Sequence, residues 1–356
     1  MNIGVRIRQA RRMLGLSYRA LAEKTGGQIS HTAISKYEKG DMVPGSVALL
    51  AMARALDQPI DFFFRPSVAH FVKPLRFRSQ TGLTKSEQQA IIEFATDFFE
   101  RYYEIEDIAD SRIDFEHPLP DTPVSNPEAA MCMAKALRKA WNLGCDPLPN
   151  VHELMELKGI KVCEAQTDND GFDGLCSRTE RGPVVVLGSW LNKNLLRKRM
   201  TEVHELAHVV LRVPDDLPER EEEKLVWSFA GELFLPEEAF RDAFGENRTS
   251  LSIAELVELK QLFGASIMAI IYRAKTLGLI DDRLNKAFWQ YANKEKWRTI
   301  GEPGDERYEG NESHSRFRQL VLKAVAEEKI SLSKGAAFLH MNLDQFRREL
   351  EEIIRG

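Results

Sequence analysis

Residues 199–213 place two histidines and a glutamate in the order His-Glu-x-x-His, with apolar residues around them. Residues four apart lie one turn apart on one face of an α-helix, so His204 and His208 can reach the same metal ion. Glu205 lies about 100° around the helix from His204, where it can take a proton from water beside the metal. The pattern predicts a buried zinc-binding helix with Glu205 as the catalytic base.

A catalytic zinc site needs a third protein ligand and an open position. The next predicted helix, EREEEKLVWSFAGELFLP, begins with several glutamates that could supply it. Glu223 lies 19 residues after His204, a spacing that lets the chain turn and send a second helix beneath the first. Ala230 and Gly231 are small enough to let the two helices approach closely. Three alternatives to Glu223 stay open, of which the first two also fit a solvated helix start: Glu219, Glu222 and Glu232.

The stretch from about residue 126 to residue 280 resembles the ImmA/IrrE family of metallopeptidases, a zincin group. The matching elements are the His-Glu-x-x-His helix, the strand motifs FDGL and PVVVLG before it, and FAGELFLPEEAF after it. The resemblance implies a zinc cofactor, or Mn²⁺ in its place. It also implies that the glutamate thirteen residues before Pro236, which is Glu223, is the third ligand. Trp227 replaces a residue that is usually small and polar in the family, so we expect it to reshape the floor of the site.

The implied reaction is hydrolysis of a peptide bond. Zinc polarises the scissile carbonyl group and acidifies water, while Glu205 takes the proton and passes it to the leaving amine. The run at residues 183–188 could present a strand edge to an extended substrate, although such a run also fits a buried strand. Tyr272 and His152 are candidates for stabilising the oxyanion, and both also fit structural roles.

The first 66 residues carry ten lysines and arginines against five acidic residues, in a chain whose net charge is −5. A basic block on an acidic chain indicates a nucleic-acid contact confined to that block. Within it, an apolar-striped helix with four arginines precedes two short predicted helices, SYRALAEK and HTAISKYEK, joined by the turn TGGQIS. Two short helices joined by a turn place the second one in the major groove of DNA.

In combination these elements resemble the Cro/C1-type (XRE) helix-turn-helix family. The resemblance implies a five-helix domain that reads a double-stranded DNA operator as a homodimer, since such domains use paired half-sites. It implies two sets of DNA contacts: His31, Thr32, Ser35 and Lys36 at base edges or phosphates, and Tyr18, Arg19 and Lys39 at the DNA backbone. The turn is about two residues longer than usual and Tyr18 replaces a common glutamine, so the bases read can differ.

The fold class predicted for the whole chain is α+β, mostly α. A capping box at Thr84 and Glu87 predicts a long helix that ends near residue 110. The zincin-like part is expected to contain a small antiparallel sheet. The predicted organisation is an XRE domain at 1–66, a helical linker at 67–124, a zinc metallopeptidase domain at 125–300, a flexible connector at 301–313 and a small helix-turn-helix-like unit at 314–356.

The four cysteines are widely spaced and form no CxxC pair, so a disulfide framework or a cysteine-based zinc site is not expected. The sequence also has no apolar run of membrane-spanning length and no apolar stretch at its start typical of a signal peptide. These features predict a cytoplasmic protein with reduced thiols and no membrane partner.

Two classes of function remain open from the sequence. The first is a DNA-binding regulator whose peptidase domain cleaves a partner repressor or antitoxin, or its own chain at 301–313, in a stress, phage or mobile-element response. The second is a zinc-responsive or antitoxin-type transcription factor whose peptidase-like domain only senses metal or mediates oligomerisation. The motif residues alone do not separate these two.

Overall fold

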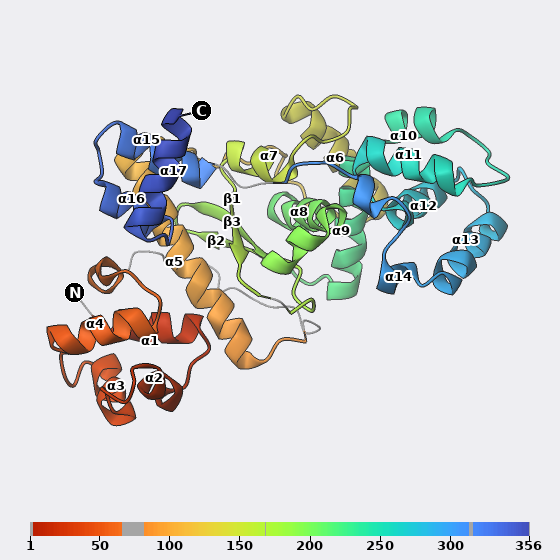
Figure 1. Cartoon of the computed structure of the whole chain (residues 1–356). Helices are drawn as coiled ribbons and strands as arrows, with labels where there is room; N and C mark the ends of the chain where they lie inside the picture. Colours follow the sequence, from red (N-terminus) through yellow and green to blue (C-terminus); the bar gives the residue numbers. More distant parts are fainter. Residues whose placement is uncertain (1–2, 66–81, 168, 313–315, 356) are drawn as a thin grey trace.

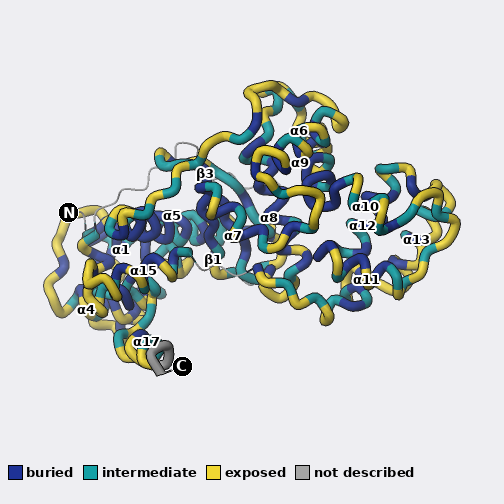
Figure 2. The backbone as a smooth tube through the Cα atoms, turned by 90° about the horizontal axis from the view of Figure 1, so that it is seen from above, coloured by how far each residue is buried: buried dark blue, intermediate teal, exposed yellow. Residues whose placement is uncertain are grey.

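A computed structural model shows groups of helices arranged around one small sheet (Figure 1). The N-terminal helices lie at one end, and the long helix α5 (Lys85–Ala109) runs from them to the sheet. Buried backbone is concentrated along α5 and around the sheet (Figure 2). Among the residues that the structure describes, no helix is both long and apolar enough to span a bilayer. These described residues are 3–65, 82–167, 169–312 and 316–355.

The central sheet has the strand order β1-β3-β2, with β1 (Lys161–Ala165), β2 (Gly174–Thr179) and β3 (Gly182–Gly188). β2 pairs antiparallel with β3, but β1 pairs parallel with it, so the expectation of an antiparallel sheet is wrong for β1. The two-residue connection between β2 and β3 forces their antiparallel pairing. β3 is the most apolar strand and is buried almost throughout, so it takes the central position and leaves β1 beside its other edge.

Both faces of the sheet are covered by helices, as the alternation of side chains along β1 and β3 allows. On one face, Val162, Val185 and Leu187 join the core formed with α8 (Leu195–Val210). On the other face, alternate residues of the same strands pack against α5 and α15 (Arg316–Ala326). Helix α8 therefore lies directly on the sheet, and the sheet fixes its position.

The remaining helices of the central part extend the core away from the sheet. α6 (Pro127–Ala140) packs along α9 (Glu219–Phe234), and α9 also contacts α8. The other elements are α7 (Val151–Leu157), η2 (Ser189–Lys193), α10 (Glu237–Phe244), α11 (Ile253–Phe263), α12 (Ile267–Thr276), α13 (Asp282–Lys294), α14 (Trp297–Ile300) and η3 (Asp305–Arg307).

The N-terminal part has the five helical elements that the sequence predicts, four α-helices and one 3₁₀ helix. Gly4 explains one close approach, because a Cβ atom there would lie 2.1 Å from the carbonyl oxygen of Tyr37. The elements are α1 (Ile3–Met13), α2 (Tyr18–Lys24), α3 (His31–Lys39), α4 (Ser46–Ala55) and η1 (Ile60–Phe64).

Helix α5 begins with the predicted capping box, in which Thr84 and Glu87 bond each other's backbone N–H groups. It is more than a linker, because it covers one sheet face and also holds α1. The Arg6 guanidinium of α1 donates to Glu100 of α5 at 2.5 Å, and both side chains are buried. The C-terminal helices α15 and α16 (Leu332–Phe338) join the same core, α17 (Leu343–Arg355) packs against α16, and Ser331 caps α16.

Residues 301–313 were expected to form a flexible connector. Two glutamates of this segment, Glu302 and Glu312, instead anchor it to the central part. Glu302 accepts hydrogen bonds from the backbone N–H groups of Ile267 and Met268 at the start of α12. Glu312 accepts from the N–H groups of Val151 and His152 at the start of α7. Both glutamates bind the start of a helix, where unpaired N–H groups attract carboxylates. The composition of the segment, rich in glycine, glutamate and serine, does not predict these tertiary contacts.

Candidate metal centre and nucleic-acid interface

Helix α8 is placed by its cap and by its apolar residues. The Asn194 side chain accepts a hydrogen bond from the backbone N–H of Arg197 at 3.0 Å and starts the helix. Four residues next to the motif histidines are fully buried in the core against the sheet and α9: Val203, Leu206, Ala207 and Val210. Their burial orients the opposite face of α8, with its two histidines, towards the start of α9.

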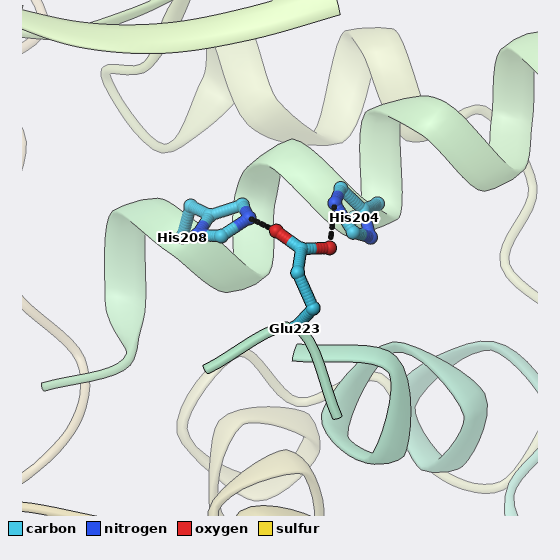
Figure 3. A group of neighbouring side chains, drawn as sticks. All are labelled: His204, His208 and Glu223. Carbon is cyan, nitrogen blue, oxygen red and sulfur yellow. Dashed lines mark ion pairs between the residues drawn. The ribbon is translucent and has the colours of Figure 1, made fainter. Parts of the chain in front are cut away.

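His204, His208 and Glu223 point towards one another between α8 and α9 (Figure 3). Nε2 of His204 lies 3.5 Å from one carboxylate oxygen of Glu223, and Nε2 of His208 lies 3.4 Å from the other. One ligand atom from each of the three residues lies within 4.8 Å of the others. The structure therefore brings together the three side chains predicted as metal ligands.

The acidic alternatives to Glu223 lie elsewhere or act differently. Glu232 is buried beside the guanidinium of Arg273, away from the histidines. Glu219 is exposed in the first turn of α9. Glu222 lies 3.3 Å from Nδ1 of His208, on the side of the ring away from Glu223.

The contact between Glu222 and His208 has a chemical consequence. When Nδ1 carries the proton and donates it to Glu222, the lone pair of Nε2 is left for a metal ion. From the sequence alone, Glu222 is a rival ligand or a solvated residue at the helix start. Its adjacency to Glu223, together with the helical spacing that turns it towards the other side of His208, was the available signal.

The donor set fits zinc. Two imidazole nitrogens and one carboxylate are the ligands of many catalytic zinc sites, and three protein ligands leave a fourth position open. His204 is almost fully buried, whereas His208 and Glu223 are partly exposed, so the site is reachable from one side. Glu205 follows His204 on α8 and is 4% exposed.

The candidate DNA interface is formed by α2 and α3, which are separated by residues 25–30. Ser30 caps α3 by accepting a hydrogen bond from the N–H of Ala33, and Gly40 ends it in the left-handed conformation. Of the residues assigned to DNA, Ser35 is half-buried, and five are exposed: Arg19, His31, Thr32, Lys36 and Lys39.

Tyr18, also assigned to DNA, has contacts inside the domain. Its hydroxyl group donates to Glu38 at 3.2 Å, and its ring lies beneath the guanidinium of Arg11, 4.3 Å from the ring centroid. Arg11 in turn holds both carboxylate oxygens of the buried Glu38. Tyr18 thus helps to fix α3 against α1 and α2.

Comparison with known proteins supports both the helix-turn-helix part and the part that carries the candidate metal ligands. Residues 7–63 match a family model described as helix-turn-helix, and residues 155–275 match one described as IrrE N-terminal-like domain. The chain joins an XRE-type helix-turn-helix domain to an IrrE-like peptidase domain.

Two curated relatives match the N-terminal part. They are uncharacterized HTH-type transcriptional regulators of Sinorhizobium medicae (strain WSM419) and Rhizobium meliloti (strain 1021), each 41% identical over 64 residues. Each match covers 18% of this chain and 45% of the relative, so the chain spans less than half the length of the relatives it matches.

A cleft of about 740 Å³ opens beside the proposed metal ligands of the IrrE-like domain. His208 and Glu222 lie on one wall, and residues of β2 lie on another. Phe115 and His117, from the chain between α5 and α6, also line it, as do residues between α8 and α9. Sequence reasoning missed these two residues because a contact across some 90 positions leaves no local pattern. β2, at the edge of the sheet, lines this cleft, whereas the run at 183–188 is the central strand and contributes only its first residue, Pro183, to the lining.

Trp227 lies against the metal centre, as expected. Its ring centroid is 4.5 Å from that of His204, with the two rings tilted by 48°. Because Trp227 is 42% exposed, it covers one side of His204 while meeting solvent with its other side. The indole therefore limits the rotation of the imidazole.

A second cluster of histidine and glutamate side chains in the IrrE-like domain includes Glu202 of α8. The Nδ1 atom of His152 lies 3.0 Å from Glu202, and Glu202 is hydrogen-bonded to Glu312, which pairs with Arg199. Burial raises the pKa of Glu202 to about 8 and, with the neighbouring Glu202 charge, raises that of Glu312 to about 7. Burial also lowers the pKa of His152. His152, a candidate for the oxyanion, is thus a buried structural residue, while Tyr272 is exposed on α12.

Proposed function

We propose that this chain is a DNA-binding transcription regulator whose IrrE-like domain is a zinc-dependent endopeptidase. Its substrate is a partner regulatory protein, a repressor or antitoxin, or the chain itself, cut at a limited site. The observation that carries the enzymatic part is the convergence of His204, His208 and Glu223 beside a cleft. The exposed face of α3 and the naming of the relatives as transcriptional regulators support the DNA-binding part.

In the proposed mechanism, His204 and His208 hold the metal through Nε2, and Glu223 holds it through its carboxylate. When bound, zinc supplies a Lewis acid for the scissile carbonyl group and makes water more acidic. Glu205 accepts the proton of the attacking water and donates it to the leaving amine. Glu222 keeps His208 in the tautomer that leaves Nε2 free, and the cleft along β2 holds the peptide.

For DNA binding, α3 enters the major groove with the side chains of its first turn facing base edges. His31 and Thr32 occupy that turn, and Lys36 lies one turn further along the same helix. Arg19 and Lys39 contact the phosphates. Two copies of the chain bind the two half-sites of an operator.

The decisive experiment is a cleavage assay with the purified zinc-loaded chain and the regulatory protein encoded beside it. We expect one or a few defined fragments, and we expect Glu205→Gln to abolish them while the zinc content stays the same. Glu219→Gln, which changes an exposed glutamate of α9, is the matched control and should cleave normally. Cleavage that persists in Glu205→Gln refutes this mechanism.

A second function, metal-dependent control of DNA binding without cleavage, is favoured by one observation. The XRE-type domain is held to α5 by the buried Arg6–Glu100 pair, and α5 packs on the sheet that carries α8. A packed route therefore connects the metal centre to α1. Gel-shift titrations with and without zinc test it, since release of DNA with both proteins intact would support sensing in place of proteolysis.

A further inference from the structure

A cavity of about 700 Å³ lies between α5, the start of α8 and the C-terminal helices. None of the three proposed metal ligands lines it, and its volume is within the range of small-molecule sites. Its apolar walls come from Phe94 and Phe98 of α5, Leu195 of α8, and Phe317 and Leu339 of the C-terminal helices. The cavity therefore lies where α5, α8 and the C-terminal helices meet, and it is large enough for a small-molecule ligand.

Of the two buried cations that line this cavity, Arg101 and Lys198, Arg101 has donor capacity left. The side chain is almost fully buried, and its guanidinium carbon lies 5.6 Å from the ring centroids of both Phe98 and Phe317. Nε donates to Asp97 at 2.8 Å, and Nη1 donates to the carbonyl oxygen of Phe338. Its third nitrogen, Nη2, makes no hydrogen bond with any residue that the structure describes.

The charges around Arg101 leave an excess of positive charge. Asp97 is completely buried and is shared by two guanidinium groups, those of Arg65 and Arg101. One carboxylate between two arginines leaves one positive charge uncompensated, and a buried site of this kind favours an anion.

The other buried cation that lines the cavity, Lys198, is already saturated. Its ammonium group donates to Glu164 at 2.6 Å, to Asn192 at 2.9 Å and to the carbonyl oxygen of Glu312 at 2.6 Å. An ammonium group has three donors, so none is left for a ligand. Arg318 also lines the cavity, but its side chain is 41% exposed and pairs with Glu349, so Arg101 is the buried cation that can bind an anion here.

We propose that this cavity binds a small organic carboxylate with an apolar, preferably aromatic, body. The carboxylate accepts a hydrogen bond from Nη2 of Arg101, and the body packs against Phe94, Phe98 and Phe317. The site is independent of the proposed peptidase activity, since it shares no residue with the metal centre. Because Asp97 joins Arg101 to Arg65 of the XRE-type domain and to His340 after α16, the ligand would occupy the junction of these parts.

The test is a fluorine NMR titration of the full-length chain. The probes are 4-fluorobenzoate and 4-fluorophenylacetate, with 4-fluorobenzamide as the neutral analogue of the first. We expect saturable broadening and shift with both acids, and binding of the amide weaker by about tenfold or more. Equal binding of acid and amide would overturn the role of Arg101, and the absence of saturable binding by both acids would overturn the site.

Two variants locate the bound probe. Leu195→Trp fills the cavity while leaving Arg101 and Asp97 in place, and Arg101→Lys keeps the charge but removes the nitrogen that faces the ligand. Each should weaken acid binding by about tenfold or more. Leu262→Trp, at an exposed position of α11 outside the cavity, is the control and should bind like the wild type. If Leu195→Trp binds the acids unchanged, the ligand lies elsewhere and the proposal is wrong, whatever the folding of Arg101→Lys.

Discussion

Helix α8 contributes residues to two clusters of histidine and glutamate side chains, and the surroundings of the two clusters differ. In the candidate metal centre, His204, His208 and Glu223 converge, His208 also lines a cleft, and the side chain of Glu223 is 23% exposed. In the other cluster, the side chains of His152, Glu202 and Glu312 are completely buried. The two clusters use the same residue types, so residue type alone does not decide between a metal site and a structural core.

The difference lies in what neutralises the carboxylates. Glu312 pairs with Arg199 and caps two N–H groups of α7, and burial raises the pKa of Glu202, which favours its neutral form. The carboxylate of Glu223 instead lies between the Nε2 atoms of two imidazoles, where a divalent cation can take their lone pairs. The buried Arg199 makes the cluster of His152, Glu202 and Glu312 structural, whereas the converging lone pairs of His204 and His208 make the other cluster a candidate metal site.

The largest predicted effect is on metal binding by the variant Glu223→Ala. Loss of one of three ligands, together with its charge, should lower zinc affinity by about three orders of magnitude, which corresponds to about 4 kcal/mol. Metal analysis after dialysis and competition with a chelator measure it. Glu219→Ala should keep its zinc, and a Glu223→Ala protein that retains stoichiometric zinc would remove the distinction between the two clusters.

The second prediction concerns stability and the variant Glu312→Ala. It leaves Arg199 buried without its carboxylate and two N–H groups without their cap, so we expect the free energy of unfolding to fall by about 3 kcal/mol. Urea unfolding followed by circular dichroism gives the value. The exposed Glu306→Ala in the same segment is the control, and zinc content of the folded Glu312→Ala protein should be unchanged. Zinc loss without loss of stability would reverse our assignment of the two clusters.

The convergence of the three candidate metal ligands was predictable because its information is local. His204 and His208 are four positions apart on one helix, and Glu223 follows on the next. The capping box of α5 and the caps of α2 and α16 were predictable for the same reason, since each involves residues three apart.

The parts that sequence reasoning missed depend on contacts between distant segments. Glu312 reaches Arg199 and the start of α7 across more than 100 positions, so a segment rich in glycine and glutamate was expected to be flexible. The parallel pairing of β1 depends on which strand takes the centre of the sheet. Phe115 and His117 likewise reach the cleft only through the tertiary fold. The domain boundaries, the DNA contacts, and the roles of the metal ligands and of Glu205 stay predictions.

The third prediction is a pH dependence of stability that Glu312→Gln should remove. The pKa of Glu312 is raised to about 7 from an ordinary value of 4.5, so the folded chain holds this proton more tightly than the unfolded chain. Its stabilising contribution is therefore complete below the ordinary pKa and is lost as the pH rises through about 7. Between about pH 5 and pH 8, the wild type should lose on the order of 2 kcal/mol relative to Glu312→Gln. If the difference in the free energy of unfolding between the two proteins stays constant from pH 5 to pH 8, the raised pKa is contradicted.

The smallest predicted effect distinguishes a ligand from a residue that positions one. Glu222 lies at Nδ1 of His208, so Glu222→Gln should weaken zinc binding by about tenfold, because the amide orients the ring without the carboxylate's charge. Chelator competition measures the affinity, and the pH at which zinc is released should rise, because protons displace a more weakly bound metal ion at a higher pH. Glu221→Gln, at an exposed residue paired with Lys224, is the neighbouring control and should leave affinity unchanged. An effect as large as that of Glu223→Ala would make Glu222 a direct ligand, and the metal centre would then extend onto the cleft wall.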